Sequence, residues 1–218
     1  MSAIAPPGPR TASKEHRRLQ LIEATIGAIA RKGYAALTLA DVAGAAGLSG
    51  GIVNFHFESK EKLLVATLRH LAEEYRQNWQ EALQATGERP AARLAALATA
   101  DFNDVVCTPD KLAAWSAFWA EAQNRPTYMQ HCGANDAEFH AAVRAIVTEI
   151  IAEGRYGERD PARLARAIDA LLEGLWLDLI TSYSPVTREE AVKTVYSCLN
   201  AFFPAHFSPS GLRGKQAS

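Results

Sequence analysis

Residues 38–60, TLADVAGAAGLSGGIVNFHFESK, contain two short helical patterns joined by a tight turn. Thr38 suits the N-cap of the first helix, because its side-chain oxygen can accept a hydrogen bond from an otherwise unpaired backbone N–H. Gly47 suits the end of that helix, where the chain needs a left-handed conformation. Ser49 can cap the second helix. The stretch therefore predicts a helix-turn-helix, whose second helix would enter the major groove of DNA.

The pattern continues into the next helix as Thr-x-x-x-Val-Ala-x-x-Ala-Gly-Leu-Ser-x-Gly-x-x-x-x-x-Phe-x-x-Lys-x-x-Leu-Leu, from Thr38 to Leu64. It resembles the DNA-binding head of the tetracycline-repressor (TetR) family. The resemblance implies a DNA-binding domain at residues 13–60, followed by a ligand-binding and dimerisation domain at residues 61–204. A helical hairpin with no DNA role is the simpler alternative.

The resemblance also implies a set of DNA contacts. Asn54 could pair with an adenine edge, and Ile52 or Phe55 could meet a thymine methyl group. Thr38 and Lys60 would bind phosphate, which positions a protein without specifying a sequence. Family members often carry Tyr in place of Asn54, so the operator sequence stays open. The expected contacts are Thr38, Ser49, Gly50, Gly51, Ile52, Asn54, Phe55, His56 and Lys60.

Charge is unevenly distributed along the 218 residues, although the net charge is only −1. Residues 1–60 hold seven Lys or Arg and four acidic residues, a balance of +3, so the remainder carries −4. A basic head on an acidic body suits a protein that binds DNA through one end. Lys14, Arg17 and Arg18 could contact phosphate, or they could form a solvated helix face.

Helical periodicity and capping signals predict an all-α fold of about nine helices. Capping residues precede proline at Thr108 and Asp160, and Thr187 with Glu190 forms a capping-box pattern. The long helix at 59–85 would begin in the head and end in the body. The expected helices are 13–32, the two of the helix-turn-helix, 59–85, 90–106, 108–124, 126–153 with a loosened point at Gly133, 161–183 and 188–203.

Apolar residues occur on more than one face of the two last helices, which is more than a surface helix needs. The resemblance implies that these helices pair with a second copy in a homodimer, and an ordinary core is the alternative. Two-fold symmetry would require a palindromic operator with half-sites about one turn, ~34 Å, apart. The residues concerned are Leu171, Leu172, Leu175, Leu179, Val192, Val195, Leu199 and Phe203.

The body carries a narrower resemblance, to choline-responsive repressors within that family. The matching segments are AWSAFWA at 114–120, Arg-Pro at 125–126 and LEGLWL at 172–177. Aromatic faces around one space would suit a quaternary ammonium through cation–π attraction, and a plain aromatic core is the alternative. Asp101, Glu121 and Glu173 are further candidates for the counter-charge. The expected ligand-binding residues are Trp115, Phe118, Trp119, Trp176 and Asp178.

Other function classes lack their signatures. The chain has no Gly-x-x-x-x-Gly-Lys-Ser/Thr, His-Glu-x-x-His or Glu-x-x-His pattern. His131, Cys132 and His140 lack the repeated close spacing of metal ligands. We therefore expect no enzyme, no metal and no cofactor, but a repressor released from DNA by a small effector. A helical adaptor with no DNA role is the alternative.

Location follows from cysteine usage and hydropathy. Three widely spaced cysteines favour a reducing cytoplasm over a disulfide framework. No apolar run approaches the ~18 residues of a membrane span, and no apolar signal core is visible. We therefore expect a cytoplasmic protein with no membrane partner, and loose tails at residues 1–12 and 205–218.

Overall fold

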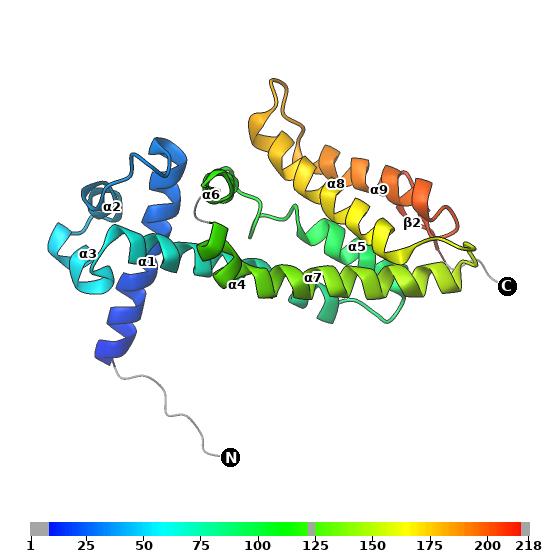
Figure 1. Cartoon of the computed structure of the whole chain (residues 1–218), viewed down its shortest axis with the longest axis horizontal. Coiled ribbons are helices and arrows are strands. Elements are labelled where there is room, and N and C mark those ends of the chain that lie inside the picture. Colours follow the sequence, from blue (N-terminus) through cyan, green and yellow to red (C-terminus); the bar gives the residue numbers. More distant parts are fainter. Residues whose placement is uncertain (1–8, 122–124, 215–218) are drawn as a thin grey trace, which may run out of the picture.

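The computed structural model describes residues 9–121 and 125–214. Within these ranges the chain is almost entirely helical, which confirms the all-α fold class (Figure 1). None of the helices in these ranges is both long and apolar enough to cross a membrane. The helices are α1 Pro9–Lys32, α2 Leu39–Ala46, α3 Gly50–Phe57, α4 Lys60–Gln84, α5 Pro90–Ala100, α6 Pro109–Ala120, α7 Arg125–Glu153, α8 Pro161–Thr181 and α9 Arg188–Phe202.

Helices α1, α2 and α3 and the start of α4 form the head. The Thr38 side chain accepts a hydrogen bond from the Asp41 backbone N–H, and the Asp41 carboxylate accepts one from the Thr38 backbone N–H. This capping box fixes the start of α2. Gly47 follows α2 with a φ of 64°, a left-handed conformation that glycine adopts without strain. The predicted helix-turn-helix at residues 38–60 is therefore confirmed.

Ser49 has the extended backbone of an N-cap, but its side chain accepts no hydrogen bond at the start of α3. The expectation that its hydroxyl caps this helix is wrong. The backbone carbonyl of Ser49 instead accepts from the Ile52 N–H at 3.0 Å. Ser59, by contrast, caps α4 by accepting from the Lys62 N–H.

The remainder of α4 packs with α5, α7, α8 and α9 to form the body, and α6 lies between the body and α1 (Figure 1). Helix α4 packs against α5 and α7, and α7 packs against α8. The fully buried aliphatic side chains at the centre of the body include Leu94, Leu97, Val143, Ile146, Ile150 and Ile168.

Several boundaries differ from those expected. Helix α1 begins at Pro9, so the expected loose tail at 1–12 is helical from that residue, and residues 1–8 lie outside the described part. Helix α5 ends at Ala100 instead of 106. The Asn103 side chain accepts hydrogen bonds from the Val105 and Val106 backbone N–H groups, and such local bonds compete with helix formation.

Helix α7 runs through Gly133 without a break, so the expected loosening there is wrong. A helical glycine costs only about 1 kcal/mol relative to Ala. The neighbouring Cys132 and Phe139 are buried in the core, and this packing outweighs the cost. Residues 122–124, the end of the helix predicted at 108–124, lie outside the described part.

The carboxyl-terminal segment is not loose as far as it is described. Strands β1 Phe207–Ser208 and β2 Gly211–Leu212 pair as an antiparallel hairpin. The Phe207 side chain is fully buried beside α9. The Tyr156 hydroxyl accepts from the Ala205 backbone N–H at 2.9 Å and lies 2.8 Å from His206 Nδ1. These contacts hold the segment to the body, and residues 215–218 lie outside the described part.

Two glycines of the helix-turn-helix make a matched stability test. Gly47→Ala should destabilise the chain by about 1–2 kcal/mol, because an L-residue is strained in the left-handed conformation. Gly44 lies inside α2, and no atom lies within 4 Å of an added Cβ. Gly44→Ala should therefore stabilise the chain by about 0.5–1 kcal/mol. Urea unfolding followed by circular dichroism measures both changes in the free energy of unfolding. Changes of the same sign in the two variants would contradict this geometry.

Candidate functional site

Helix α3 exposes one side and buries the other in the head. Val53 and Phe57 are buried, which fixes the rotation of the helix about its axis. The exposed side offers one amide and one large ring, the Phe55 ring being 70% exposed. These groups suit contacts to an adenine edge and a thymine methyl group. The exposed residues of this region are Ser49, Gly50, Gly51, Asn54 and Phe55.

Ile52 and His56 are half-buried at the edge of the exposed side. The Nδ1 atom of His56 is buried and has no hydrogen-bond partner among the described residues. Burial, with the charges of Lys14 and Arg18 nearby, holds the pKa of His56 below its ordinary value. The neutral imidazole is therefore favoured, which suits packing against Phe55 at 5.3 Å between ring centroids better than charge pairing.

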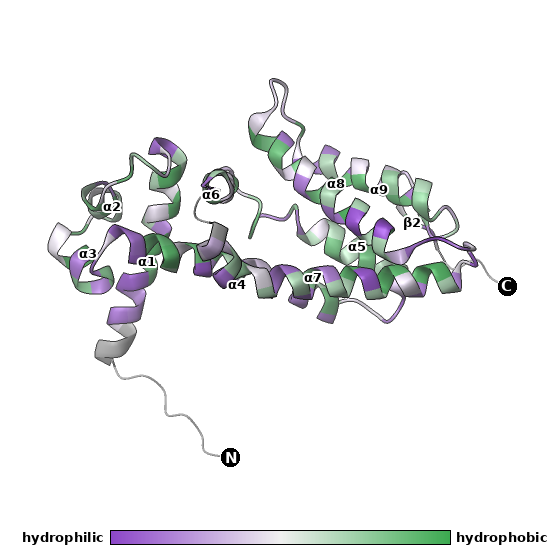
Figure 2. Cartoon of the chain, viewed as in Figure 1, coloured by the Kyte–Doolittle hydropathy of each residue, from purple (hydrophilic) through white to green (hydrophobic). Residues whose placement is uncertain are grey.

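The start of α1 adds positive charge beside α3. Lys14 Nζ lies 5.5 Å from the centroid of the Phe55 ring, and the Arg18 guanidinium lies 5.1 Å from that of Phe57. Side chains at positions 13–19 are all exposed, and this part of α1 projects from the head as a hydrophilic rod (Figure 2). The basic residues noted in the sequence thus extend the exposed side of α3.

The two expected phosphate contacts already have partners in the free chain. Lys60 Nζ donates to the Ala35 carbonyl at 3.0 Å, which leaves two of its three donors unused. The Thr38 hydroxyl donates to the Asp41 carboxylate at 2.7 Å. Both residues lie at helix starts in the head, Thr38 before α2 and Lys60 on the first turn of α4.

A cavity of about 110 Å³ lies in the body between α4, α6, α7 and α8. The Trp119 ring centroid is 6.0 Å from that of Trp115 and 6.4 Å from that of Trp176. The volume holds several waters or a small organic molecule. Faces of several rings around one space favour a cation. The aromatic residues of the lining are Tyr75, Trp115, Trp119, Tyr128, Phe139 and Trp176.

Four carboxyl groups also line the cavity, namely those of Asp101, Asp136, Asp169 and Glu173. Asp101 is 3% exposed and accepts a hydrogen bond from the Tyr75 hydroxyl at 2.9 Å. Burial, reinforced by the charges of Asp169 and Glu173, raises the pKa of Asp101 to about 7. Burial also raises the pKa of each of the other three carboxyl groups. The cavity is therefore acidic, with Asp101 and Asp169 buried, Asp136 half-buried and Glu173 exposed.

Phe118 and Asp178, which we expected among the ligand-binding residues, lie outside this cavity. Phe118 instead packs edge-on against Tyr34, with 5.5 Å between ring centroids. Each residue advances about 100° around a helix, so Phe118 points away from Trp119. The same rotation, about 200° over two residues, separates Asp178 from Trp176. The structure thus brings together the three tryptophans only.

Helix α7 supplies lining residues that the sequence reading missed. Tyr128, Asp136 and His140 occur at multiples of four along this helix and share one face. This four-residue spacing is the sequence signal that predicts a shared face for these three side chains. Of the other acids considered as counter-charges, Asp101 and Glu173 line the cavity, and Glu121 lines a smaller one near Tyr34 and Phe118.

An open groove of about 1030 Å³ lies along α1, α4 and α7. Its lining mixes acidic and basic side chains and contains no Trp, Tyr or Phe, so it does not share the chemistry of the aromatic cavity. His131 lines this groove, whereas His140 lines the aromatic cavity. The structure therefore separates the two histidines that were considered as metal ligands.

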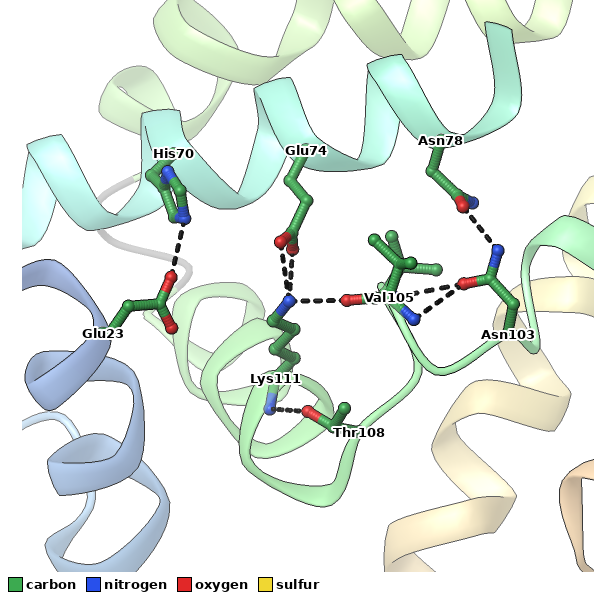
Figure 3. Close-up of polar contacts among 9 residues, drawn as sticks. Glu23, His70, Glu74, Asn78, Asn103, Val105, Thr108 and Lys111 are labelled. Carbon is green, nitrogen blue, oxygen red and sulfur yellow. Dashed lines mark hydrogen bonds and ion pairs between the residues drawn. The ribbon is translucent and has the colours of Figure 1, made fainter. Parts of the chain in front are cut away.

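Polar contacts connect α4 to α1, to the loop that follows α5 and to α6 (Figure 3). Asn78 donates to the Ala100 carbonyl at 3.0 Å, directly before Asp101. Lys111, near the start of α6, pairs with Glu74 of α4 at 2.6 Å. These bonds place α4, the end of α5 and α6 in one contiguous arrangement.

Comparisons with known proteins agree with this geometry. Residues 21–67 match the family described as bacterial regulatory proteins, tetR family, and residues 90–204 match the BetI-type transcriptional repressor, C-terminal family. The HTH-type transcriptional regulator BetI of Burkholderia mallei is 32% identical over 185 residues, which cover 85% of this chain and 92% of that protein. The chain belongs to the TetR family. In this TetR-family regulator the first match contains α2 and α3, and the second contains α5 to α9.

Further relatives support the TetR fold along most of the chain. BetI of Burkholderia cenocepacia is 29% identical over 192 residues, 88% of this chain and 96% of that protein. A transcriptional regulator from Pseudomonas aeruginosa has a TM-score of 0.73 at 24% identity, covering 87% of this chain and 91% of its own. A regulator from Saccharomonospora viridis, solved in complex with choline, has a TM-score of 0.72 at 20% identity, covering 85% and 96%.

The raised pKa of Asp101 predicts a pH dependence of folding. Between its ordinary pKa near 4 and about 7, Asp101 is protonated in the folded chain and ionised in the unfolded chain. The folded state therefore loses stability as pH rises through this range, by about 1.4 kcal/mol per unit of pKa shift. Asp101→Asn should shrink the difference in urea midpoint between pH 5 and pH 8. The exposed Glu158→Gln serves as the control, and an unchanged difference in Asp101→Asn would contradict this assignment.

Proposed function

We propose that this TetR-family regulator is a repressor that binds a palindromic operator as a homodimer and leaves DNA when a small organic cation occupies the aromatic cavity. The observation that carries the proposal is that three tryptophan rings and four carboxyl groups, two of them buried, line the same cavity. The exposed side of α3, flanked by the basic start of α1, supports the DNA-binding half. The match to the TetR family supports both the DNA-binding half and the ligand-binding half of the proposal.

The proposed homodimer rests on the apolar residues of α8 and α9, which divide into two sets. Leu172, Val195 and Leu199 are buried in the core of the chain itself. Tyr183 is fully exposed. A second copy packed on these helices would cover the outer set, and its two-fold symmetry would require half-sites ~34 Å apart. The half-buried outer residues are Leu171, Leu175, Leu179 and Val192.

Choline or a related amine is the proposed effector. The Saccharomonospora viridis regulator was solved with choline, and the acidic aromatic cavity here has the chemistry for such a cation. By linkage, a ligand that prefers the conformation with misplaced heads weakens DNA binding by its differential affinity. A regulator that binds chromosomal DNA would act in the cytoplasm.

DNA recognition can be tested by separating positioning from specificity. Asn54→Ala should relax the preference at one base of each half-site, because its amide is the exposed base-reading group of α3. Lys60→Ala should weaken binding to all DNA sequences about equally. It should also lower the slope of log affinity against log salt concentration by about 1. Selection from random DNA and gel retardation at several salt concentrations measure both.

Arg163→Ala is the matched control, since it removes a positive charge that is 89% exposed on the body. It should leave affinity and salt slope unchanged. Loss of sequence preference in Lys60→Ala would contradict the assigned roles. Absence of retardation for every sequence would favour the alternative, a helical adaptor with no DNA role.

Cation binding can be tested by calorimetry with choline and betaine aldehyde. Trp119→Ala should weaken binding about tenfold, because a desolvated cation–π contact is worth ~1–2 kcal/mol. Phe118→Leu is the matched control on the same helix and should leave affinity unchanged, since Phe118 lies outside the cavity. No heat from the unmodified chain with any trimethylammonium compound would end the proposal of a cation site.

A further inference from the structure

One carboxylate oxygen of the aromatic cavity has no hydrogen-bond partner in the described part of the chain. Asp169 is 8% exposed, and its Oδ2 lies 2.6 Å from His140 Nδ1. Its Oδ1 is fully buried and has no hydrogen-bond partner within residues 9–121 and 125–214. A buried acceptor without a donor is unfavourable, and such atoms are rare in folded proteins. The cavity therefore has an acceptor that a ligand could satisfy.

Two of the three tryptophan N–H donors of the cavity are already engaged. Trp176 Nε1–H donates to the Asp101 carbonyl at 2.9 Å, and Trp119 Nε1–H donates to the Tyr128 hydroxyl at 3.4 Å. The rings thus offer their faces to a cation, and these two donors are not directed at Asp169. A trimethylammonium group has no N–H, so it would satisfy the rings and leave the carboxylate edge unpaired.

We infer that Asp169 determines specificity by accepting a hydrogen bond from an O–H or N–H group carried by the cationic effector. This inference rests on the proposed function of the cavity as a cation site. His140 is a positioning residue, because it occupies Oδ2 and leaves Oδ1 for the ligand. Asp169 lines the cavity, and because the terminal torsion of an aspartate is soft, a modest rotation would make Oδ1 accessible to a ligand there.

Three cations of nearly equal size separate the effect of the hydrogen-bond donor on affinity from the effect of the positive charge. Choline carries a hydroxyl donor, propyltrimethylammonium replaces this hydroxyl by a methyl group, and (2-methoxyethyl)trimethylammonium keeps only an acceptor. Calorimetry on the full chain at one pH should show choline binding at least about tenfold more tightly than the other two, as expected for a hydrogen bond to a charged group.

Variants of Asp169 test the residue assignment. Asp169→Ala should abolish the preference for choline, because all three cations then lose the same carboxylate charge and only choline also loses a hydrogen bond. Asp169→Asn keeps the side-chain size if the alanine variant fails to fold, and it should reduce the preference to a few-fold. Asp178→Asn is the matched control, an acid of the same helix outside the cavity, and should keep the full preference.

The outcomes distinguish this inference from the proposed function. Equal affinity of the unmodified chain for the three cations would overturn the inference and leave the cation site standing. A full preference retained in both Asp169→Ala and Asp169→Asn would overturn the role of Asp169. If none of the three cations bound the folded chain, the proposed cation site would fail, and this inference with it.

Discussion

Helix α4 contributes to two hydrophobic cores at once. Leu63 and Leu64 are buried among the helices of the head, and Trp79 is buried in the body more than four turns later. A continuous helix transmits displacement along its length, because each turn is hydrogen-bonded to the next. The head cannot rotate relative to the body without disturbing packing at one end of α4.

Helix α6 provides a second connection. Lys111 pairs with Glu74 of α4 at 2.6 Å, and both side chains are largely shielded from solvent. Helix α6 also packs along α1, and a Cβ at Gly27 would lie only 3.2 Å from the Asp110 carboxylate oxygen of α6, so that side chain would have to shift. Trp115 and Trp119 belong to this same helix. A shift of their rings around a ligand would therefore displace α6 at its contact with α1 of the head.

The sequence predicts the head more completely than the cavity, for a physical reason. The capping box at Thr38 and the left-handed turn at Gly47 depend on residues within one or two turns, so local rules decide them. The cavity draws on four helices, and its lining depends on how each is rotated by distant packing. Four-residue spacing alone predicts that Trp115 and Trp119 lie together. Excluding Asp178 from the cavity requires the rotation of α8 about its axis, and recognising the role of Asp169 requires its contact with His140 of α7.

Four carboxyl groups line one cavity, and two of them are buried, which costs stability that a bound cation would offset. Desolvation raises the pKa of Asp101, Asp169 and Glu173, and repulsion from neighbouring carboxyl groups adds to the rise at Asp101 and Glu173. A cation between them would remove much of this repulsion and favour the ionised forms. A ligand can shift a conformational equilibrium only through its differential affinity. Carboxylates that repel one another until a cation arrives supply such a difference, because only a conformation that admits the ligand is relieved.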